Sequence, residues 1–320
     1  MTDFVLLTGF LGTGKTTLLR DFLRHPEAAD TAIIVNEAGE IDIDGAIIAA
    51  DATGLPMAML ANGCVCCSIA NDLLYTIEAL IAARQGPPFR RIILETSGLA
   101  QPGPIIRSLG ELGPIGMRVQ VVTVCDPTSP IPDHDGFETA SAQIAAAGVL
   151  VLSKLDRADP TPLVAGLSAI NPLAACIIEP DPARRALRAF TTEAPPGVIL
   201  DAPPGHPRIN VLTARIDAAP IAAILEWLEN LSGLAGDRLL RLKGVLHPAD
   251  VEGGVLFQAV GATFDAPRRF TGTAEPGLVL IVRDLPSADI AALQPGFPLR
   301  LTQKAADPFR KPTAFVLRAD

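Results

Sequence analysis

The chain has 320 residues, enough for two domains, and its 49% hydrophobic and 19% charged residues indicate an ordered globular protein. A formal net charge of −9, with no block of Lys or Arg, argues against a nucleic-acid partner. No apolar run approaches the length of a membrane span and no basic segment precedes the first apolar run, so we expect a cytosolic protein without a membrane partner.

Apolar runs alternate with helical segments through residues 1–192. The runs are rich in Val, Ile and Leu, as is typical of strands buried on both faces of a parallel sheet. They are Phe4–Leu7, Ala32–Val35, Arg91–Leu94, Val119–Val124, Val149–Leu152 and Ala175–Ile178. We therefore predict an α/β domain over 1–192, built on a mostly parallel sheet.

Residues 193–208 are dense in Pro and Gly and predict a linker. Beyond this linker the strand-like runs outnumber the helical segments, which favours a smaller α+β domain over residues 209–320. The expected strands are Ile209–Ile216, Leu239–Val245, Val255–Val260 and Leu278–Arg283, and the expected helices are Pro220–Leu231 and Ser287–Leu293.

A complete Walker A phosphate loop, G-F-L-G-T-G-K-T, occupies residues 9–16. It follows the strand-like run Phe4–Leu7 and precedes helical apolar spacing, which is the context that the motif requires. Backbone amides would face the phosphates, Lys15 would reach the β- and γ-phosphates, and Thr16 would bind Mg²⁺. The nucleotide-binding residues predicted here are Gly9, Gly12, Thr13, Gly14, Lys15, Thr16 and Thr17.

An acidic residue ends the run before E-T-S-G, where a phosphate-loop NTPase carries its Walker B acid and switch II glycine. Glu95 would orient the Mg²⁺ shell and the Gly98 amide would sense the γ-phosphate. An ordinary turn after a strand is the alternative. We predict that Lys15, Thr16 and Glu95 carry catalysis.

The sequence S-K-L-D follows another apolar run at residues 153–156. GTPases commonly carry N-K-x-D at this point, where the lysine packs over the base and the aspartate accepts from guanine. Lys154 and a buried Asp156 would therefore favour guanine over adenine. Ser153 replaces the usual asparagine, and adenine selectivity or a plain polar turn stays open.

Three cysteines stand close together at Cys64, Cys66 and Cys67, between the nucleotide motifs. In a reducing cytosol such a cluster favours metal binding over a disulfide. A fourth ligand would come from Glu37, a histidine, water or a second chain. Glu37 belongs to the acidic segment 36–45, near the expected switch I. A redox-sensing thiol pair or a buried turn with inert cysteines remains an alternative.

Together these motifs resemble the CobW-like family of SIMIBI-class phosphate-loop GTPases. The matching segments are G-F-L-G-T-G-K-T-T-L-L, N-E-A-G-E-x-x-I-D-G, N-G-C-V-C-C, E-T-S-G-L-A-x-P and S-K-L-D. The resemblance implies a GTP-dependent metallochaperone that delivers Zn²⁺, Co²⁺ or a related ion to a client apo-protein. It implies a C-x-C-C metal motif at Cys64, Cys66 and Cys67.

The chain departs from that family in its histidines, of which it has only 4. It lacks a His-rich stretch and carries A-P-R-R-F at 266–270 in place of a common histidine. His134, flanked by acids, is the auxiliary ligand to test, whereas Cys125 and Cys176 suit buried packing.

Two other functions stay open for the sequence. One is a metal- or redox-responsive GTP-binding protein with vestigial hydrolysis, and the other is a phosphate-loop kinase acting on a small molecule. A homodimer that depends on nucleotide or metal also stays open.

Overall fold

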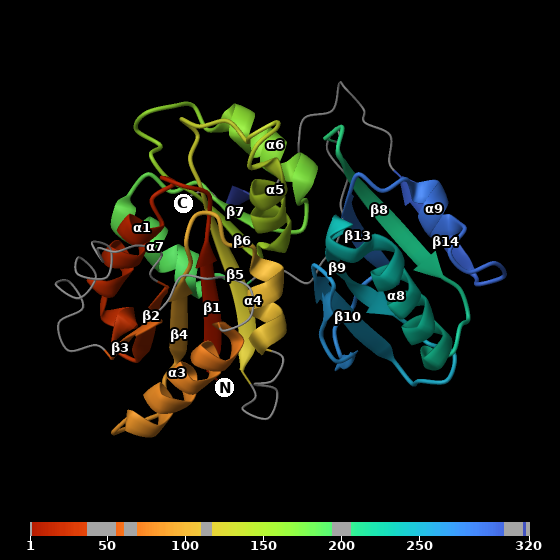
Figure 1. Cartoon of the computed structure of the whole chain (residues 1–320), viewed down its shortest axis with the longest axis horizontal. Helices are drawn as coiled ribbons and strands as arrows, with labels where there is room; N and C mark the ends of the chain where they lie inside the picture. The colour runs from red at the N-terminus through yellow and green to blue at the C-terminus, as the bar shows by residue number, and fades with distance from the viewer. Residues whose placement is uncertain are drawn as a thin grey trace. The chain divides into compact units, whose positions relative to one another are not determined.

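The structure is a computed structural model that describes residues 2–36, 56–60, 69–109, 117–193, 206–303 and 316–317. Contacts divide the chain into two compact units (Figure 1). The first comprises Met1–Leu163, Ala175–Ala194 and Phe315–Asp320, and the second comprises Val164–Ala174 and Pro195–Ala314. Within the described ranges, no helix is both long and apolar enough to cross a membrane.

The first unit is built on an eight-stranded sheet in the order β15-β7-β6-β5-β1-β4-β2-β3, with every neighbouring pair parallel. The strands are β1 (Asp3–Thr8), β2 (Thr31–Asn36), β3 (Met57–Leu60), β4 (Arg91–Glu95), β5 (Arg118–Cys125), β6 (Val149–Leu152), β7 (Ala175–Ile177) and β15 (Val316–Leu317). This confirms the predicted parallel α/β sheet. Because β1 lies between β4 and β5, the loop that follows it lies at the middle of the sheet's carboxyl edge.

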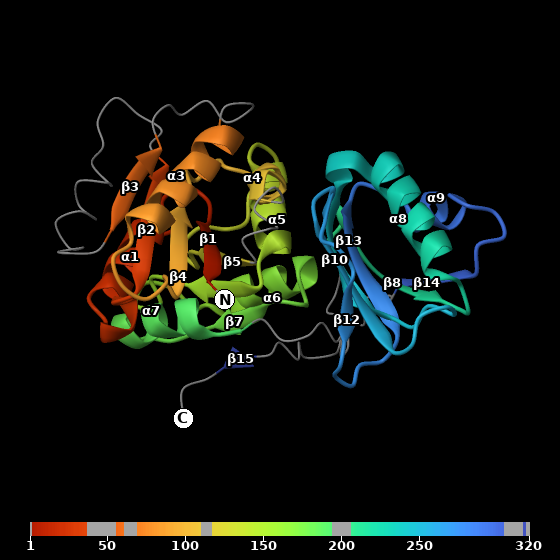
Figure 2. The same cartoon turned by 90° about the horizontal axis from the view of Figure 1, so that it is seen from below.

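Helices cover both faces of this sheet (Figure 2). They are α1 (Lys15–Leu23), α3 (Ile69–Ala83), α4 (Pro102–Leu109), α5 (Phe137–Ala146) and α7 (Pro182–Thr191), whereas α6 (Thr161–Ile170) begins in the first unit and belongs to the second from Val164 on. On one face α1 packs beside α7, with the Phe22 and Phe190 rings 4.6 Å apart. On the other face lie α3, α4 and α5. Burial on both faces explains why the strands read as continuous apolar runs.

The second unit holds a separate antiparallel sheet in the order β11-β10-β9-β13-β8-β14, with β12 paired to β10. Its strands are β8 (Ile209–Ile216), β9 (Leu239–Leu246), β10 (Gly254–Val260), β11 (Thr263–Phe264), β12 (Arg268–Phe270), β13 (Gly277–Arg283) and β14 (Leu299–Gln303). Helix α8 (Ile221–Ala235) packs on it through Trp227, and α9 (Ser287–Ala291) is shorter. This confirms the predicted α+β unit.

The end of the chain joins the first sheet. In β15, Val316 and Leu317 pair in parallel with Cys176 and Ile177 of β7. The predicted range 209–320 did not anticipate this strand, because a two-residue pairing leaves no periodic pattern in the sequence. The domain boundaries otherwise stay predictions.

Candidate nucleotide-binding site

The phosphate loop is held between a buried strand and a packed helix. All residues of β1 after Asp3 are buried, and α1 is anchored in the core by Leu18, Leu19 and Phe22. Gly14 precedes the helix with φ 93° and offers no side-chain cap. The first amides of α1 therefore lie beside the loop, where an anion can accept from them.

Two glycines of the predicted site tolerate no side chain. Gly9 has φ +145°, and a Cβ there would lie 2.5 Å from the Val124 carbonyl oxygen. A Cβ on Gly98 would lie 2.7 Å from the Leu11 backbone nitrogen. The loop after β4 thus lies directly against the phosphate loop, as a switch region of a phosphate-loop protein should.

Lys15 lies against the loop that precedes it. Its Nζ donates to the carbonyl oxygens of Gly9 at 2.9 Å and Phe10 at 3.2 Å. The ammonium therefore lies at the concave backbone that the sequence assigns to phosphates. Phosphate oxygens would be stronger acceptors than these neutral carbonyls, because a hydrogen bond between two charged groups is the stronger kind.

Thr16 and Glu95, the two residues that the sequence analysis assigns to Mg²⁺, lie in direct contact. The Thr16 hydroxyl Oγ1 donates to Glu95 Oε1 at 2.7 Å, and Glu95 is only 5% exposed at the end of β4. The neighbouring Thr96 donates through both N–H and hydroxyl to the Leu7 carbonyl, which fixes the end of β4 beside β1. A hydroxyl and a carboxylate are the oxygen ligands that Mg²⁺ prefers, so these residues fit that ion.

Gln143 is a buried residue of this region that the sequence analysis missed. From α5, its Nε2 donates to the carbonyl oxygens of Gly98 at 3.0 Å and Ala100 at 2.9 Å. It thereby fixes the loop that approaches Leu11. The available signal was a single amide within the apolar stretch S-A-Q-I-A-A-A, since a buried amide needs partners.

The turn S-K-L-D lies beside the phosphate loop. The Ser153 amide donates to the Cys125 carbonyl at 2.9 Å, which continues the pairing of β6 with β5. Lys154 adopts φ 47°, and its Nζ donates to the Gly12 carbonyl at 2.8 Å. The structure thus places the Lys154 ammonium on the phosphate loop, and its predicted packing over a base stays a prediction.

Asp156 differs from the expectation of a buried carboxylate. Its side chain is 80% exposed, and its closest ionic neighbour is Arg157, with Oδ2 and Nε 3.8 Å apart. Its position at the outer end of the turn leaves it in solvent. A nucleotide base that bound to Asp156 would have to shield this exposed side chain from solvent.

Asp126, which follows β5, is a second residue that the sequence analysis missed. Its Oδ2 accepts from Lys154 Nζ at 2.5 Å, while Oδ1 accepts from the Thr128 amide and hydroxyl. Burial alone would raise the pKa of Asp126, but the hydrogen bonds from Lys154 and Thr128 outweigh it and lower that pKa. The carboxylate is therefore ionised at neutral pH.

The predicted metal ligands Glu37, Cys64, Cys66 and Cys67 lie outside the described residues. Within the described ranges no cluster of three or more His, Cys, Asp or Glu could hold a metal ion. Burial raises the pKa of Cys176 to about 12 and that of Cys125 further, so both thiols stay protonated. This agrees with the packing role predicted for these two cysteines.

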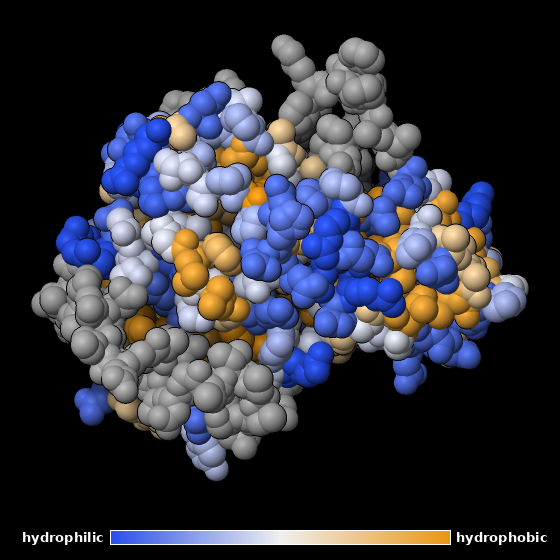
Figure 3. Space-filling view, turned by 45° about the horizontal axis from the view of Figure 1, so that its top comes forward, coloured by the Kyte–Doolittle hydropathy of each residue, from blue (hydrophilic) through white to orange (hydrophobic). Residues whose placement is uncertain are grey.

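Two leucines at the loop are exposed. Leu11 is 59% exposed and Leu99, beside Gly98, is 58% exposed. On the face drawn in Figure 3, hydrophobic residues gather in several groups separated by polar residues, and a broad group lies at the right. The neighbourhood of the phosphate loop therefore presents apolar side chains as well as polar backbone.

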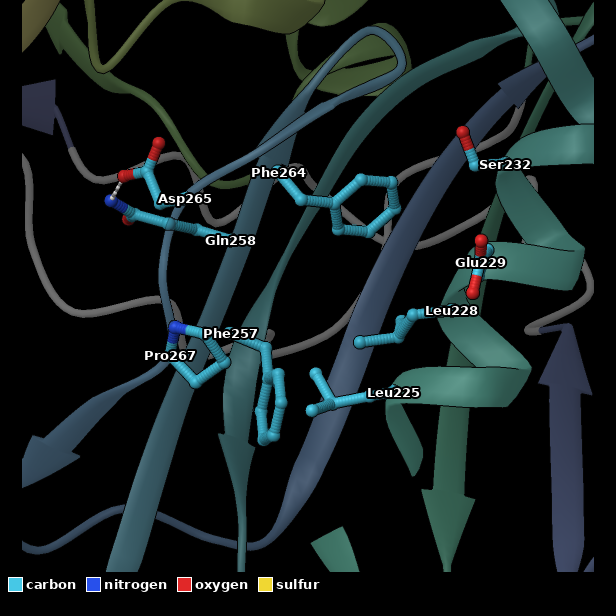
Figure 4. A pocket seen from close by; sticks show the side chains of 9 residues that line it. All are labelled: Leu225, Leu228, Glu229, Ser232, Phe257, Gln258, Phe264, Asp265 and Pro267. Carbon is cyan, nitrogen blue, oxygen red and sulfur yellow. Dashed lines mark hydrogen bonds between the residues drawn. The ribbon is translucent and has the colours of Figure 1, made fainter. Parts of the chain in front are cut away.

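The second unit contains a pocket of its own. A pocket of about 290 Å³ opens between α8 and the strands β10 and β11, with mainly apolar walls (Figure 4). It is lined by Leu225, Leu228, Glu229, Ser232, Phe257, Gln258, Phe264, Asp265 and Pro267. None of the predicted nucleotide or metal residues lines this pocket.

Comparison with known proteins agrees with both units. The family model "CobW/HypB/UreG, nucleotide-binding domain" matches residues 3–174, and "Cobalamin synthesis protein cobW C-terminal domain" matches residues 211–294. The zinc chaperone YjiA of Escherichia coli K12 is 30% identical over 306 residues, which cover 90% of this chain and 96% of YjiA. The zinc chaperone CobW of a Sinorhizobium species is 28% identical, covering 90% of this chain and 94% of that protein.

The fold has a solved counterpart. A crystal structure of Zn(II)-bound YjiA GTPase from E. coli matches with a TM-score of 0.64 and 25% identity, covering 91% of this chain and 97% of the other. Matches to both domains, together with the loop geometry, identify the family. The chain belongs to the CobW/HypB/UreG family and is one of its GTPases.

Proposed function

We propose that this protein is a metallochaperone that hydrolyses GTP and delivers a transition metal to a client protein. The observation that carries the proposal is the phosphate loop with Lys15 against it and Thr16 bonded to Glu95, in a chain that aligns over 90% of its length with a zinc chaperone. A GTPase site can switch a protein between a GTP-bound and a GDP-bound state. The names of the relatives suggest that metal binding is the property that would change between these states.

The nucleotide would bind with its phosphates on residues 9–17 and its base at Lys154 and Asp156. Thr16 and Glu95 would hold Mg²⁺, which neutralises charge on the phosphates. Lys15 would leave the Gly9 and Phe10 carbonyls for phosphate oxygens, and the Gly98 amide would meet the γ-phosphate. Catalysis by Lys15, Thr16 and Glu95 would consist of positioning and charge neutralisation.

The cargo would be Zn²⁺ or Co²⁺, held by Cys64, Cys66 and Cys67 with Glu37. Zinc has the better support, because the relatives covering most of this chain are named zinc chaperones. The cysteines lie between the phosphate loop and Glu95 in the sequence, so a nucleotide-dependent change nearby could alter metal affinity. His134, on an exposed loop, remains an auxiliary candidate.

The partners in this proposal are a client metalloprotein and a second copy of the chain. Exposed Leu11 and Leu99 beside the loop support a dimer that depends on nucleotide, since exposed apolar side chains favour association. The proposal places the protein in the cytosol, where the cysteine cluster stays reduced.

Metal titration in the presence of Mg²⁺ with GTP or with GDP tests the proposal. Wild type should bind Zn²⁺ or Co²⁺ stoichiometrically, with an affinity that differs between the two nucleotides. The double variant Cys66→Ala, Cys67→Ala should lose this binding while keeping GTP affinity. Cys176→Ala is the matched control, because that thiol is buried on β7. Unchanged metal affinity in the double variant would overturn the metal site.

A further inference from the structure

We infer that Asp126 is a positioning residue for guanine selectivity, which acts by holding the Lys154 ammonium on the phosphate loop. The inference rests on the proposed function, in that it assumes a guanine nucleotide bound with its base at the turn 153–156. It assigns a role to a carboxylate that lies outside every motif of the sequence.

The geometry supplies the first step. Lys154 Nζ is shared between the Gly12 carbonyl, at 2.8 Å, and Asp126 Oδ2. Gly12 is part of the loop proposed for the phosphates, whereas Asp126 lies at the end of β5. With its head fixed at both, Lys154 has only its aliphatic stem and its backbone turn left to meet a base. The stem is the part of a lysine suited to lie on an apolar ring face.

The surroundings of Asp126 supply the second step. Its side chain is 5% exposed, and the Thr128 amide and hydroxyl donate to Oδ1 at 2.8 Å and 2.7 Å. The carboxylate therefore has a fixed orientation before any nucleotide binds, and its free oxygen is directed at Lys154. Partly buried pairs of this kind are screened less by salt than fully exposed ones are.

The chain contains its own comparison, because D-P-T occurs twice. Asp159 accepts from the Thr161 amide at 3.0 Å and from its hydroxyl at 2.7 Å, in the same pattern as Asp126 with Thr128. Asp159 is exposed, and within the described residues its hydrogen bonds come from Thr161. The hydrogen-bonded turn alone is thus a general feature, and the contact with Lys154 is what distinguishes Asp126.

The test compares Asp126→Asn with wild type by measuring affinity for GTP, GDP and ATP, and kcat at saturating GTP. Asn keeps an acceptor for Thr128 and removes the charge that holds Lys154. Affinities for GTP and GDP should both fall by about tenfold, since a hydrogen bond between charged groups is lost. ATP affinity and kcat should change little. A preserved GTP-to-ATP ratio, or a loss confined to kcat, would overturn the inference.

Two further variants separate a positioning role from a structural one. Asp126→Asn added to Lys154→Met should cost nothing beyond Lys154→Met alone, because Asp126 acts through that lysine. Asp159→Asn, the matched control, should leave the GTP-to-ATP ratio unchanged. A fully additive double variant would contradict the inference.

Should Asp126→Asn not fold, Thr128→Ala decides the question. It removes one of the two hydrogen bonds that Thr128 donates to Oδ1 of Asp126, and it should lower the GTP-to-ATP ratio in the same direction by a smaller factor. No change in a folded Thr128→Ala would count against the inference. A wild-type protein that does not prefer GTP over ATP would instead refute the guanine assignment in the proposed function.

Discussion

The two sides of the proposed nucleotide site, one for the phosphates and one for the base, differ in how their lysines are held. On the phosphate side, Lys15 donates to two carbonyls of its own loop, which a phosphate could replace. On the base side, Lys154 donates to Gly12 and to the buried carboxylate of Asp126. Lys154, on the side proposed for the base, is thus held in advance, whereas Lys15 would have to change partners when a nucleotide binds.

This difference assigns separate tasks to the two sides. A group that changes partners on binding can respond to which phosphates are present, as a sensor of hydrolysis must. A group that keeps its partners contributes equally to GTP and GDP. Variants on the phosphate side should therefore alter turnover, and variants on the base side should alter selectivity.

The largest effect is expected for Lys15→Ala. Turnover should fall by about a hundredfold or more for GTP and ATP alike, because one positive charge that would stabilise the phosphates is lost. Phosphate release at saturating nucleotide measures it. Lys154→Ala is the paired variant and should retain kcat. Wild-type turnover in Lys15→Ala would remove the distinction between the two sides.

The next effect is expected for Asp156→Ala. The preference for GTP over ATP should be erased, a change of about tenfold or more, because the acceptor for the guanine N–H groups is gone. Competition binding measures it, with turnover at saturating GTP as the control. A surviving preference for GTP would show that another residue recognises guanine. The exposure of the Asp156 side chain makes this test necessary, because an exposed carboxylate does not yet form a binding site.

Strands were predictable from the sequence where their apolar residues are also the buried ones. In the second unit, expected Ile209–Ile216 is β8 itself, and expected Val255–Val260 is β10 less its first residue. By contrast β14 was missed, because in Leu299–Gln303 the exposed and half-buried residues are largely polar. Edge strands such as β14 bury little, so their sequences carry a weak signal.

The site was predictable where its residues share one motif. The loop 9–16 and Glu95 were singled out because one is a complete Walker A motif and the other precedes T-S-G at the expected Walker B position. Asp126 and Gln143 were not, because their partners lie 28 and 45 residues away. D-P-T occurs at Asp126 and again at Asp159, and only the tertiary fold brings one of them to a lysine.

A moderate effect is expected for Gly98→Ala, which tests how closely the phosphate side is packed. The added Cβ would meet the Leu11 backbone at 2.7 Å, so the two loops must separate. We expect a loss of stability of about 1–3 kcal/mol, with reduced turnover. Calorimetry measures the loss of stability, and phosphate release measures turnover.

Gly233→Ala, on α8, is the matched control. Its new Cβ meets nothing within 4 Å, and about 0.5–1 kcal/mol of stabilisation is expected. Equal effects at both glycines would contradict the close approach.

The smallest effect concerns Lys243 on β9, a third lysine in an environment unlike that of Lys154. Burial, together with the charge of Arg241, lowers the pKa of Lys243 from 10.5 to about 8. The folded state therefore releases this proton at lower pH than the unfolded state does. A charged Lys243 costs stability below about pH 8, and this cost disappears as the pH rises toward 10.5.

The difference in unfolding free energy between Lys243→Met and wild type isolates that contribution. From pH 7 to pH 9 wild type should gain about 1 kcal/mol relative to the variant, which has no group to titrate there. Trp227 is the only tryptophan and is fully buried in the second unit, so its fluorescence during urea unfolding reports on that unit. A difference independent of pH would mean that Lys243 keeps an ordinary pKa.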